Sequence, residues 1–420
     1  MFDRRRFAGG LLPFALASLL IAVQPSPSAF AQQAAGTTAA PVAGQKTMET
    51  VRIGYLRSYE PTLALSVLDV PPENIGLAGA KVAIKDNDTT GSFMGQKFVL
   101  DPVTIKPGDD VAAPVQKMLD SGDHYIVTDL SADDTLKAAD LAKAKGAIVL
   151  NAGAEDDRLR NKDCRDNMFH IAPSRSMLTD GLAQYLMWKQ WRNWALVEGS
   201  HPNDKLFAEA LKRSAKKFGG KIVGEKVFED RGSARETDSG QALVQKQIPL
   251  FLQSLPDHDV LLVADESEVF GTYIPWRTWI PRPVAGTAGL VPASWHPASQ
   301  QWGGEQMQSR FLREAGRRML AKDMQAWTAV RVIGEAASRT QSADPAKLDA
   351  FIRSDKFTVA AFKGQRLTFR DWDWQLRQPI LLATYKSVVS TSPQEGFLHQ
   401  TSELDTLGFD KPETTCKFDR

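Results

Sequence analysis

Residues 194–228, WALVEGSHPNDKLFAEALKRSAKKFGGKIVGEKVF, contain the pattern that decides the fold class. The short apolar run at 194–198 is typical of a buried strand, and residues 204–218 have the length and composition of a helix. Two glycines at 219–220 end that helix, and a second strand-like run follows at 221–228. A strand, a helix and a strand of these lengths predict a βαβ unit with parallel strands.

The same alternation recurs on both sides of this unit. Further strand-like runs lie at 51–56, 125–128, 147–150 and 260–264, and further helical patterns at 131–145, 176–191, 236–255 and 319–337. The two series join near Ile171-Ala172-Pro173. We therefore expect an α/β fold of two Rossmann-like lobes, each with a parallel sheet covered by helices on both faces.

The first 31 residues have the features of a secretory signal peptide. Three arginines at 4–6 precede a mostly apolar run at 8–23, and Ala29-Phe30-Ala31 has the small-x-small pattern of a cleavage site. Arginines followed by Phe7 also fit the twin-arginine signal, so Sec and twin-arginine export both remain open. We expect cleavage near Ala31, a flexible leader at 32–47, and a mature protein located in the periplasm.

Composition excludes several classes of function. The chain has 51 basic and 50 acidic residues, 43% hydrophobic residues and 24% charged residues. These fractions are typical of a globular protein, and the balance of charge argues against a nucleic-acid partner. The sequence contains no G-x-S-x-G, H-E-x-x-H, C-x-x-C, Walker or G-x-G-x-x-G motif, and its six histidines are scattered. We therefore expect a protein that is not an enzyme and has no metal site.

Two cysteines, Cys164 and Cys416, are the only ones in the chain. An even number in an oxidising compartment predicts a disulfide. Such a bond would fasten the C-terminal tail to the middle of the chain. Two unpaired thiols are the alternative.

Ligands of parallel α/β sheets bind beyond the carboxyl ends of the strands, and this rule yields a set of candidate residues. Polar or aromatic side chains at or near these positions and at the join between the lobes are Arg57, Tyr59, Asn151, Arg158, Arg175 and His201. Asp265 and Glu266 also follow a strand, whereas the acidic run 155–157 fits better as charges at a helix N-terminus.

A proline-rich loop, YIPWRTWIPRP at 273–283, carries large aromatic and basic side chains, and a second such spot lies at 295–297. These segments add Trp276, Arg277, Trp279, Trp295 and His296 to the candidate ligand-binding residues. Aromatic side chains in loops either fill a core or line a cleft, and both interpretations stay open here. Tryptophan beside arginine suits a flat anionic ligand, because it combines stacking with bidentate carboxylate binding.

Longer motifs resemble one family. They are APSRSML at 172–178, GSHP at 199–202, VADE at 263–266, RTWIPRPVAGT at 277–287, FKG at 362–364, QLRQPILLAT at 375–384 and SPQEGFLHQ at 392–400. With the signal peptide and the two lobes, they resemble type I periplasmic solute-binding proteins of the branched-chain amino acid receptor kind. They are most similar to a subfamily associated with alcohol catabolism that depends on pyrroloquinoline quinone (PQQ).

The resemblance implies three crossings between the lobes and delivery of a small ligand to an ABC transporter permease in the inner membrane. From the two series of strands and helices and the join at Pro173-Ser174-Arg175, we expect a first lobe at 48–171 and 288–355, a second lobe at 172–287, and a return to the second lobe with a C-terminal tail at 356–420. We expect a monomer without a catalytic cofactor, whose transported ligand is PQQ. The alternatives are a receptor for an amino acid or another small metabolite, a ligand sensor, and an exported non-transport protein of PQQ-linked alcohol oxidation.

Overall fold

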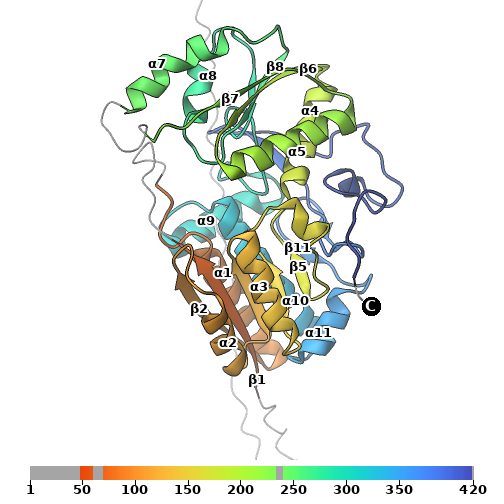
Figure 1. Ribbon diagram of the computed structural model, residues 1–420. Coiled ribbons are helices and arrows are strands. Elements are labelled where there is room, and N and C mark those ends of the chain that lie inside the picture. Colours follow the sequence, from red (N-terminus) through yellow and green to blue (C-terminus); the bar gives the residue numbers. More distant parts are fainter. Residues whose placement is uncertain (1–47, 60–69, 233–239, 419–420) are drawn as a thin grey trace, which may run out of the picture. The chain divides into compact units, whose positions relative to one another are not determined.

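The structure is a computed structural model that describes residues 48–59, 70–232 and 240–418 (Figure 1). The predicted signal peptide at 1–31 and the leader at 32–47 lie outside the described residues. Among the residues described, no helix is long and apolar enough to cross a membrane.

The first lobe is built on a parallel sheet with strand order β2-β1-β3-β4-β5. Its strands are β1 (Glu49–Ser58), β2 (Gln96–Ile105), β3 (Tyr125–Asp129), β4 (Ile148–Asn151) and β5 (Met168–His170). The helices that pack with it are α1 (Leu77–Met94), α2 (Ala112–Asp120), α3 (Ala132–Lys143), α10 (Ala321–Thr340) and α11 (Pro345–Ile352). The predicted helix start is confirmed, because the Ser131 hydroxyl accepts a hydrogen bond from the Asp134 backbone N–H.

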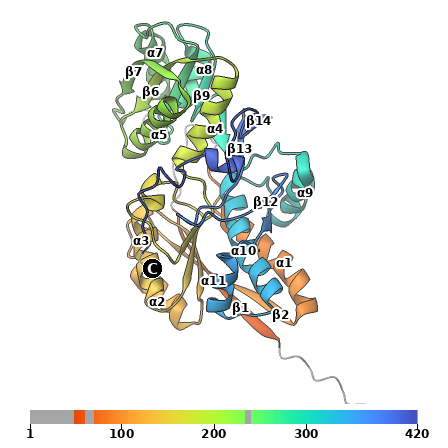
Figure 2. The ribbon, with the colours of Figure 1, turned by 90° about the vertical axis from the view of Figure 1, so that its right-hand side faces the viewer.

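Separate apolar cores cover the two faces of this sheet. Helices α1 and α10 pack on one face, and α2 and α3 pack on the other. Figure 2 shows α1, α10 and α11 as neighbours. The close approach of α1 to α10 requires Gly79, because a Cβ there would lie 1.9 Å from the Asp323 carbonyl oxygen. The helices are thus held on the sheet by burial of their apolar faces.

The second lobe repeats this plan with strand order β7-β6-β8-β9, again parallel. Its strands are β6 (Asn193–Gly199), β7 (Lys221–Phe228), β8 (Val260–Ala264) and β9 (Val284–Gly286). Its helices are α4 (Arg175–Trp188), α5 (Pro202–Phe218), α7 (Gly240–Leu252) and α8 (Ile274–Arg277). The βαβ unit predicted from residues 194–228 is confirmed as β6, α5 and β7. The α/β class with parallel sheets is therefore confirmed.

Shorter elements complete the chain. A three-stranded antiparallel sheet contains β10 (Val291–Ala293), β13 (Ile380–Ala383) and β14 (Val388–Ser392), and a two-stranded one contains β11 (Val359–Ala360) and β12 (Arg366–Leu367). The remaining helices are α9 (Gly304–Ala315) and the 3-10 helices η1 (Asp157–Arg160), η2 (Gly271–Tyr273), η3 (Gln301–Gly303) and η4 (Glu403–Thr406).

The apolar cores correct two predicted boundaries. Residues from Phe357 to Leu376 contribute to the core of the first lobe, whereas Ile380 and Leu407 contribute to that of the second. The return to the second lobe therefore begins after Leu376 and not at 356. Strand β10 pairs with β13 of the second lobe, whereas Trp295 packs in the core of the first lobe. The chain therefore crosses from the second lobe to the first at 293–295 and not at 288. A short apolar run does not indicate in which of the two lobes it is buried, so these boundaries could not be predicted from the sequence.

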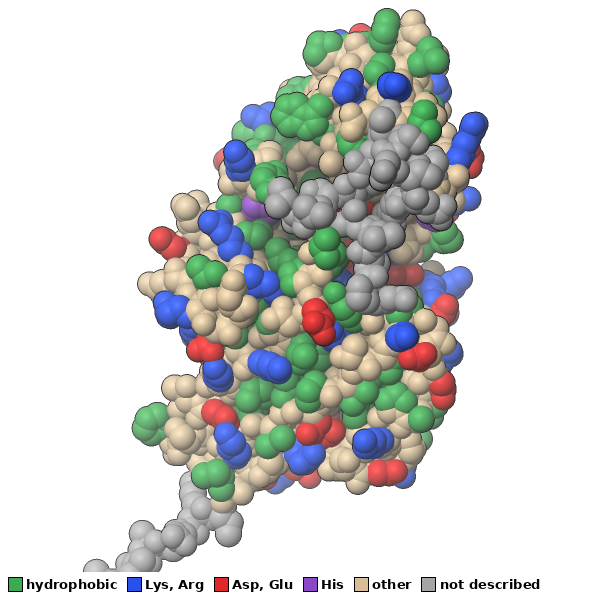
Figure 3. All heavy atoms as spheres, turned by 90° about the vertical axis from the view of Figure 1, so that its left-hand side faces the viewer, with side chains coloured by type: hydrophobic (Ala, Val, Ile, Leu, Met, Phe, Trp, Pro, Cys, Tyr) green, Lys and Arg blue, Asp and Glu red, His purple; other side chains and the backbone are tan. Residues whose placement is uncertain are grey.

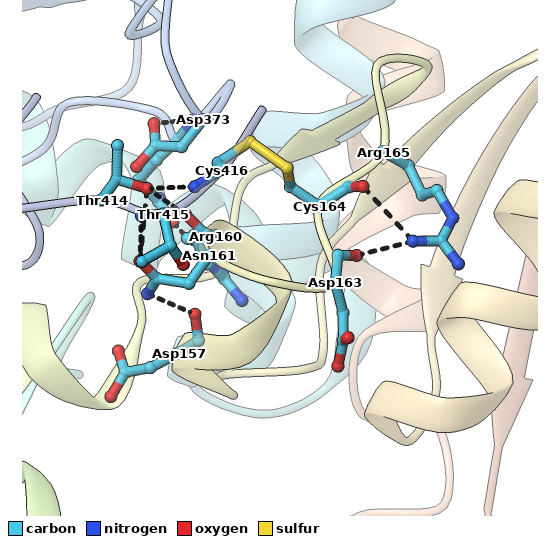
Figure 4. Close-up of a disulfide and its surroundings, with 11 residues drawn as sticks. Asp157, Arg160, Asn161, Asp163, Cys164, Arg165, Asp373, Thr414, Thr415 and Cys416 are labelled. Carbon is cyan, nitrogen blue, oxygen red and sulfur yellow. Dashed lines mark hydrogen bonds between the residues drawn. A yellow bond between two sulfur atoms is a disulfide. The ribbon is translucent and has the colours of Figure 1, made fainter. Parts of the chain in front are cut away.

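A disulfide joins Cys164 to Cys416, as the cysteine count predicted (Figure 4). Thr414 donates a hydrogen bond from its hydroxyl to the Arg160 carbonyl at 2.9 Å, and the Thr415 N–H donates to the Asn161 amide oxygen at 3.2 Å. The end of the tail is thus fixed to the first lobe covalently and by hydrogen bonds.

Candidate functional site

A cavity of about 230 Å³ lies at the carboxyl ends of β8 and β9, beside the loop that follows β4 and the first turn of α10. Its apolar wall consists of Leu178, Phe207, Val291, Pro292, Ala293 and Ala321. Its polar wall consists of Glu155, Asp265, Glu266, Glu268, Gly286, Thr287, Ser294 and Gln325. We call this cavity the strand-end pocket. Its position is the one that parallel α/β proteins use for ligands.

Glu155 is the distinctive side chain of the strand-end pocket. Among the described residues, its carboxylate has no hydrogen-bond or ion-pair partner. Burial, reinforced by the nearby charge of Glu266, raises the pKa of Glu155 to about 7, although Arg175, Lys322 and Arg160 oppose the shift. A carboxylate in this state gains most from a positively charged partner that enters the pocket.

Arg175 is committed to fixed carboxylates. Its Nε and Nη2 donate to the two oxygens of Glu266 at 2.9 and 2.7 Å, and its Nη1 donates to Asp156 at 2.9 Å. The side chain is only 7% exposed. This bidentate pair ties α4 to the loop after β8, and Asp156 ties α4 to the loop after β4. The guanidinium therefore serves the scaffold of the pocket.

Asp265 has a structural role in the same region. Its carboxylate accepts hydrogen bonds from the backbone N–H groups of Val269, Phe270 and Gly271 at 3.0, 2.8 and 2.6 Å. Burial raises the pKa of Asp265, and these three donors oppose the shift. The carboxylate thus shapes the loop after β8, which positions Glu266.

Buried polar side chains join the crossing segments below the pocket. Arg160 donates from Nε to the Gln375 amide oxygen at 2.9 Å and from Nη2 to the Ala172 carbonyl at 2.7 Å. Gln378 donates to the Ile171 carbonyl at 2.7 Å. The first and third crossings are thus fixed to each other by satisfied hydrogen bonds, as a defined hinge requires.

None of the eleven predicted ligand-binding residues is among those described as lining the strand-end pocket. Buried members are Arg57, Asn151, Arg175 and Trp295, and exposed or partly exposed ones are Tyr59, Arg158, His201, Trp276, Arg277, Trp279 and His296. Of these eleven residues, Arg175 contributes most directly to the pocket, because it pairs with Glu266.

Several of the buried and charged members have structural partners. Arg57 donates to the Ile75 carbonyl at 2.9 Å and stacks on Tyr59, with 4.7 Å between the guanidinium carbon and the ring centre. Asn151 donates to the Ala154 carbonyl at 2.8 Å, which shapes the loop that carries Glu155. Arg158 forms ion pairs with Asp133 and Asp163, and the His201 Nε2 lies at hydrogen-bond distance, 2.8 Å, from an Asp230 carboxylate oxygen.

The aromatic members separate into two environments. Trp295 lies in the core of the first lobe, whereas Trp276 is 86% exposed and Trp279 is 55% exposed. Arg277 donates to the Gln245 side chain at 3.1 Å, and His296 accepts from the Ala298 N–H at 3.1 Å. The structure does not bring these residues together at the pocket, and their role in binding stays a prediction.

Sequence reasoning missed Glu155 as a pocket residue. It lies in an acidic run that was interpreted as helix-terminal charge. Asp157 from the same run does lie at a helix N-terminus, because it accepts hydrogen bonds from the N–H and hydroxyl of Ser176 in the first turn of α4, whereas Glu155 lines the pocket. The sequence feature that could have identified Glu155 is its position after the carboxyl end of a strand. Glu266 has the same feature.

The face drawn in Figure 3 carries basic and acidic side chains interspersed with one another. This distribution agrees with the formal net charge of +1. Among the described residues, no group of three or more histidine, cysteine or acidic side chains is placed to hold a metal ion.

Two lobes with parallel sheets, joined by crossings and with a pocket at their strand ends, define the class of two-lobed α/β binding proteins. The sequence matches the family described as periplasmic binding protein over residues 74–390, and the chain belongs to this family. Membership places the protein in the periplasm, among binding proteins rather than enzymes.

Solved structures show the same fold. A periplasmic binding protein from Burkholderia mallei is 18% identical, with a TM-score of 0.63 over 89% of this chain and 100% of that chain. A leucine-, isoleucine-, valine-, threonine- and alanine-binding protein from Brucella ovis, in a closed conformation, is 16% identical, with a TM-score of 0.66 over the same shares. An ABC transporter substrate-binding protein from Desulfitobacterium hafniense in complex with Leu is 16% identical, with a TM-score of 0.62 over 82% of this chain and 100% of that chain. A search among curated proteins finds no match.

Proposed function

We propose that the protein is the periplasmic receptor of an ABC importer and binds a small solute that carries an ammonium group. The observation that carries the proposal is the Glu155 carboxylate in the strand-end pocket, which is unpaired among the residues described. The family, the predicted signal peptide and the similarity to amino-acid-binding proteins support it. In this role the protein acts as a monomer that delivers its ligand to a permease in the inner membrane; a sensor would use the same pocket.

The pocket's size and wall define the solute further. A volume of about 230 Å³ is below the roughly 300–1,000 Å³ common for drug-sized ligands. Six apolar side chains surround the acidic groups, so a small solute with an aliphatic part and a positive charge fits the chemistry best. An amino acid such as leucine has these properties.

PQQ is the second candidate, and it rests on the resemblance of the seven motifs between 172 and 400 to the PQQ-associated subfamily and on the predicted tryptophan, arginine and histidine side chains. The charges in the strand-end pocket do not favour it. PQQ is a tricarboxylate, whereas Glu155, Glu266 and Glu268 line this pocket and Arg175 already pairs with acidic side chains. Like charges in a poorly solvated site repel each other strongly. We therefore give the ammonium-bearing solute precedence over PQQ.

The first test compares two ligands that differ in one group. We expect L-leucine to bind at least about tenfold more tightly than 2-hydroxy-4-methylpentanoate, in which a hydroxyl replaces the ammonium, because a lost charge pair costs about 1.4 kcal/mol or more. Glu155→Gln should remove most of this difference. Isothermal titration calorimetry measures both affinities.

Glu209→Gln is the matched control, because Glu209 is exposed on α5 and away from the pocket. It should leave both affinities unchanged. Equal binding of the two ligands to the wild type, or an unchanged preference in Glu155→Gln, contradicts the proposal. Heat with PQQ and none with amino acids would favour the second candidate.

Binding should also depend on pH. The pKa of Glu155 is raised from 4.5 to about 7, and an ammonium group pairs with the ionised form only. We therefore expect the affinity for leucine to fall about tenfold for each pH unit below 7, and to level off above it. In the free protein the sign is opposite: stability falls as the pH rises from 4.5 to 7, because ionising Glu155 in its pocket is unfavourable.

Titrations between about pH 5.5 and pH 8 measure this dependence. Glu155→Gln should bind leucine weakly with a flat pH profile. A profile that keeps its slope in this variant would assign the titration to another group.

A further inference from the structure

A second and larger cavity lies on the first lobe, formed by α1, α10, η3 and the hairpin of β11 and β12. Its volume is about 710 Å³, within the roughly 300–1,000 Å³ of small-molecule sites, and none of its lining residues belongs to the strand-end pocket. We call it the aromatic pocket. The function proposed above makes no use of it.

Three aromatic side chains line the aromatic pocket. Trp327 and Phe362 lie with their ring centres 5.5 Å apart, and Trp302 is 51% exposed. The Trp302 indole lies directly against Gly364, where an added Cβ would come within 2.7 Å of the ring. Trp327 is buried, whereas Trp302 is exposed and Phe362 is partly exposed, so these two rings are the ones available for stacking with a planar group.

The backbone of this pocket adopts an unusual conformation. Trp302 and Phe362 have positive φ values of 52° and 57°. Bulky side chains rarely adopt this region, which costs of order 1–3 kcal/mol, and such residues concentrate at functional sites. Two of them border the same cavity and present their rings to it.

Positive charge dominates the polar part of the lining. Arg310, Arg331 and Arg366 line the pocket together with one acidic residue, Asp86. Asp86 pairs with Arg310, and Arg331 donates to Asn87 and lies 3.8 Å from Glu335. The Nε of Arg310 is buried and lacks a partner among the described residues. Arg366 is exposed, and within the part of the chain that the structure describes its side chain donates only a long hydrogen bond, 3.4 Å, to Thr358.

We infer that the aromatic pocket is a second ligand site, which takes a planar aromatic carboxylate. Its rings would stack on Trp302 and Phe362, and its carboxylate would accept hydrogen bonds from the guanidinium groups. Acidic side chains that could repel such an anion are few, in contrast to the strand-end pocket. The two sites therefore select opposite charges.

The test uses naphthalene-2,6-dicarboxylate as a probe in isothermal titration calorimetry with the full mature chain. We expect binding to the wild type and at least fivefold weaker binding, by loss of stacking, to Trp302→Ala. Arg366→Gln should weaken binding by a similar factor, and because Arg366 is exposed this variant should fold. The saturated analogue, decahydronaphthalene-2,6-dicarboxylate, should bind at least fivefold more weakly than the probe.

Trp188→Ala is the matched control, because Trp188 is 49% exposed at the end of α4 and outside this pocket. It should bind the probe like the wild type, as should Glu155→Gln. No binding of the probe at millimolar concentration, equal binding of the saturated analogue, or loss in Glu155→Gln with none in Trp302→Ala and Arg366→Gln overturns the inference. Leucine binding should be unchanged in Trp302→Ala, so the two proposals fail independently.

Discussion

Replacing Asp405 by alanine is expected to lower the free energy of unfolding by about 3–5 kcal/mol, because it takes the shared carboxylate from the buried Arg370 and the mostly buried Arg377. Asp405 is fully buried and accepts hydrogen bonds from Arg370 Nε at 2.9 Å and Arg377 Nε at 2.8 Å. Arg370, also buried, donates to the carbonyls of Leu404 and Leu407. These contacts join the third crossing and the hairpin before it to the tail.

Urea unfolding followed by far-ultraviolet circular dichroism measures this effect. Asp371→Ala is the control, because Asp371 forms an ion pair with Lys411 at 3.1 Å in which both side chains are more than 60% exposed. An exposed pair contributes about 0–1 kcal/mol, so this variant should unfold close to the wild type. A loss below about 1 kcal/mol in Asp405→Ala would show that the buried arginines find other partners.

Removing the disulfide should have an effect of comparable size. The Cys164–Cys416 bond closes a loop with a sequence separation of 252 residues, and cross-links over long loops restrict the unfolded chain most. We expect the double variant Cys164→Ser/Cys416→Ser to lose about 2–5 kcal/mol of unfolding free energy.

The control for this variant is the wild type unfolded in the presence of a reductant, which should reproduce the loss. The oxidised and reduced proteins are compared by urea titration and by the unfolding midpoint on heating. An unchanged midpoint in the double variant would mean that the tail is held by its hydrogen bonds alone, such as that from Thr414 to Arg160.

Both predictions concern the path of the C-terminal tail. Leu407 packs in the core of the second lobe, and the Gly408 N–H donates to buried Asp180 at 2.8 Å in the same lobe. A few residues later, Cys416 is bonded to Cys164 of the first lobe. The tail is therefore a further connection between the lobes, in addition to the three crossings. We expect its release to alter ligand affinity as well as stability.

Local periodicity predicted most strands of the two sheets but missed β2 and β5 at the edges of the first-lobe sheet. The apolar runs at 194–198 and 260–264 became the central strands of the second lobe, because a fully buried parallel strand needs a short continuous apolar stretch. The helix at 204–218 ended at its glycines, as α5 does at Phe218 before Gly219. These strands and this helix end depend on residues that are close together in the sequence, so they can be predicted from the sequence alone.

Two tryptophans show what the local sequence pattern could not predict. The sequence predicts proline-containing loops with basic or histidine neighbours around Trp276 and Trp295, yet the structure places Trp276 in the short helix α8, exposed, and Trp295 in a core. Which of them is buried depends on the elements that pack over each loop. No pattern within the loop contains that information.

The sequence by itself indicated the α/β class, most of the two series of parallel strands and the disulfide, since these follow from short-range patterns and from the cysteine count in an exported chain. Only the tertiary structure decided the two pockets. The raised pKa of Glu155 requires burial beside Glu266, and the aromatic pocket requires Trp302, Trp327 and Phe362 from separate segments. Burial and proximity are properties of the folded chain, and they turn ordinary residues into a site.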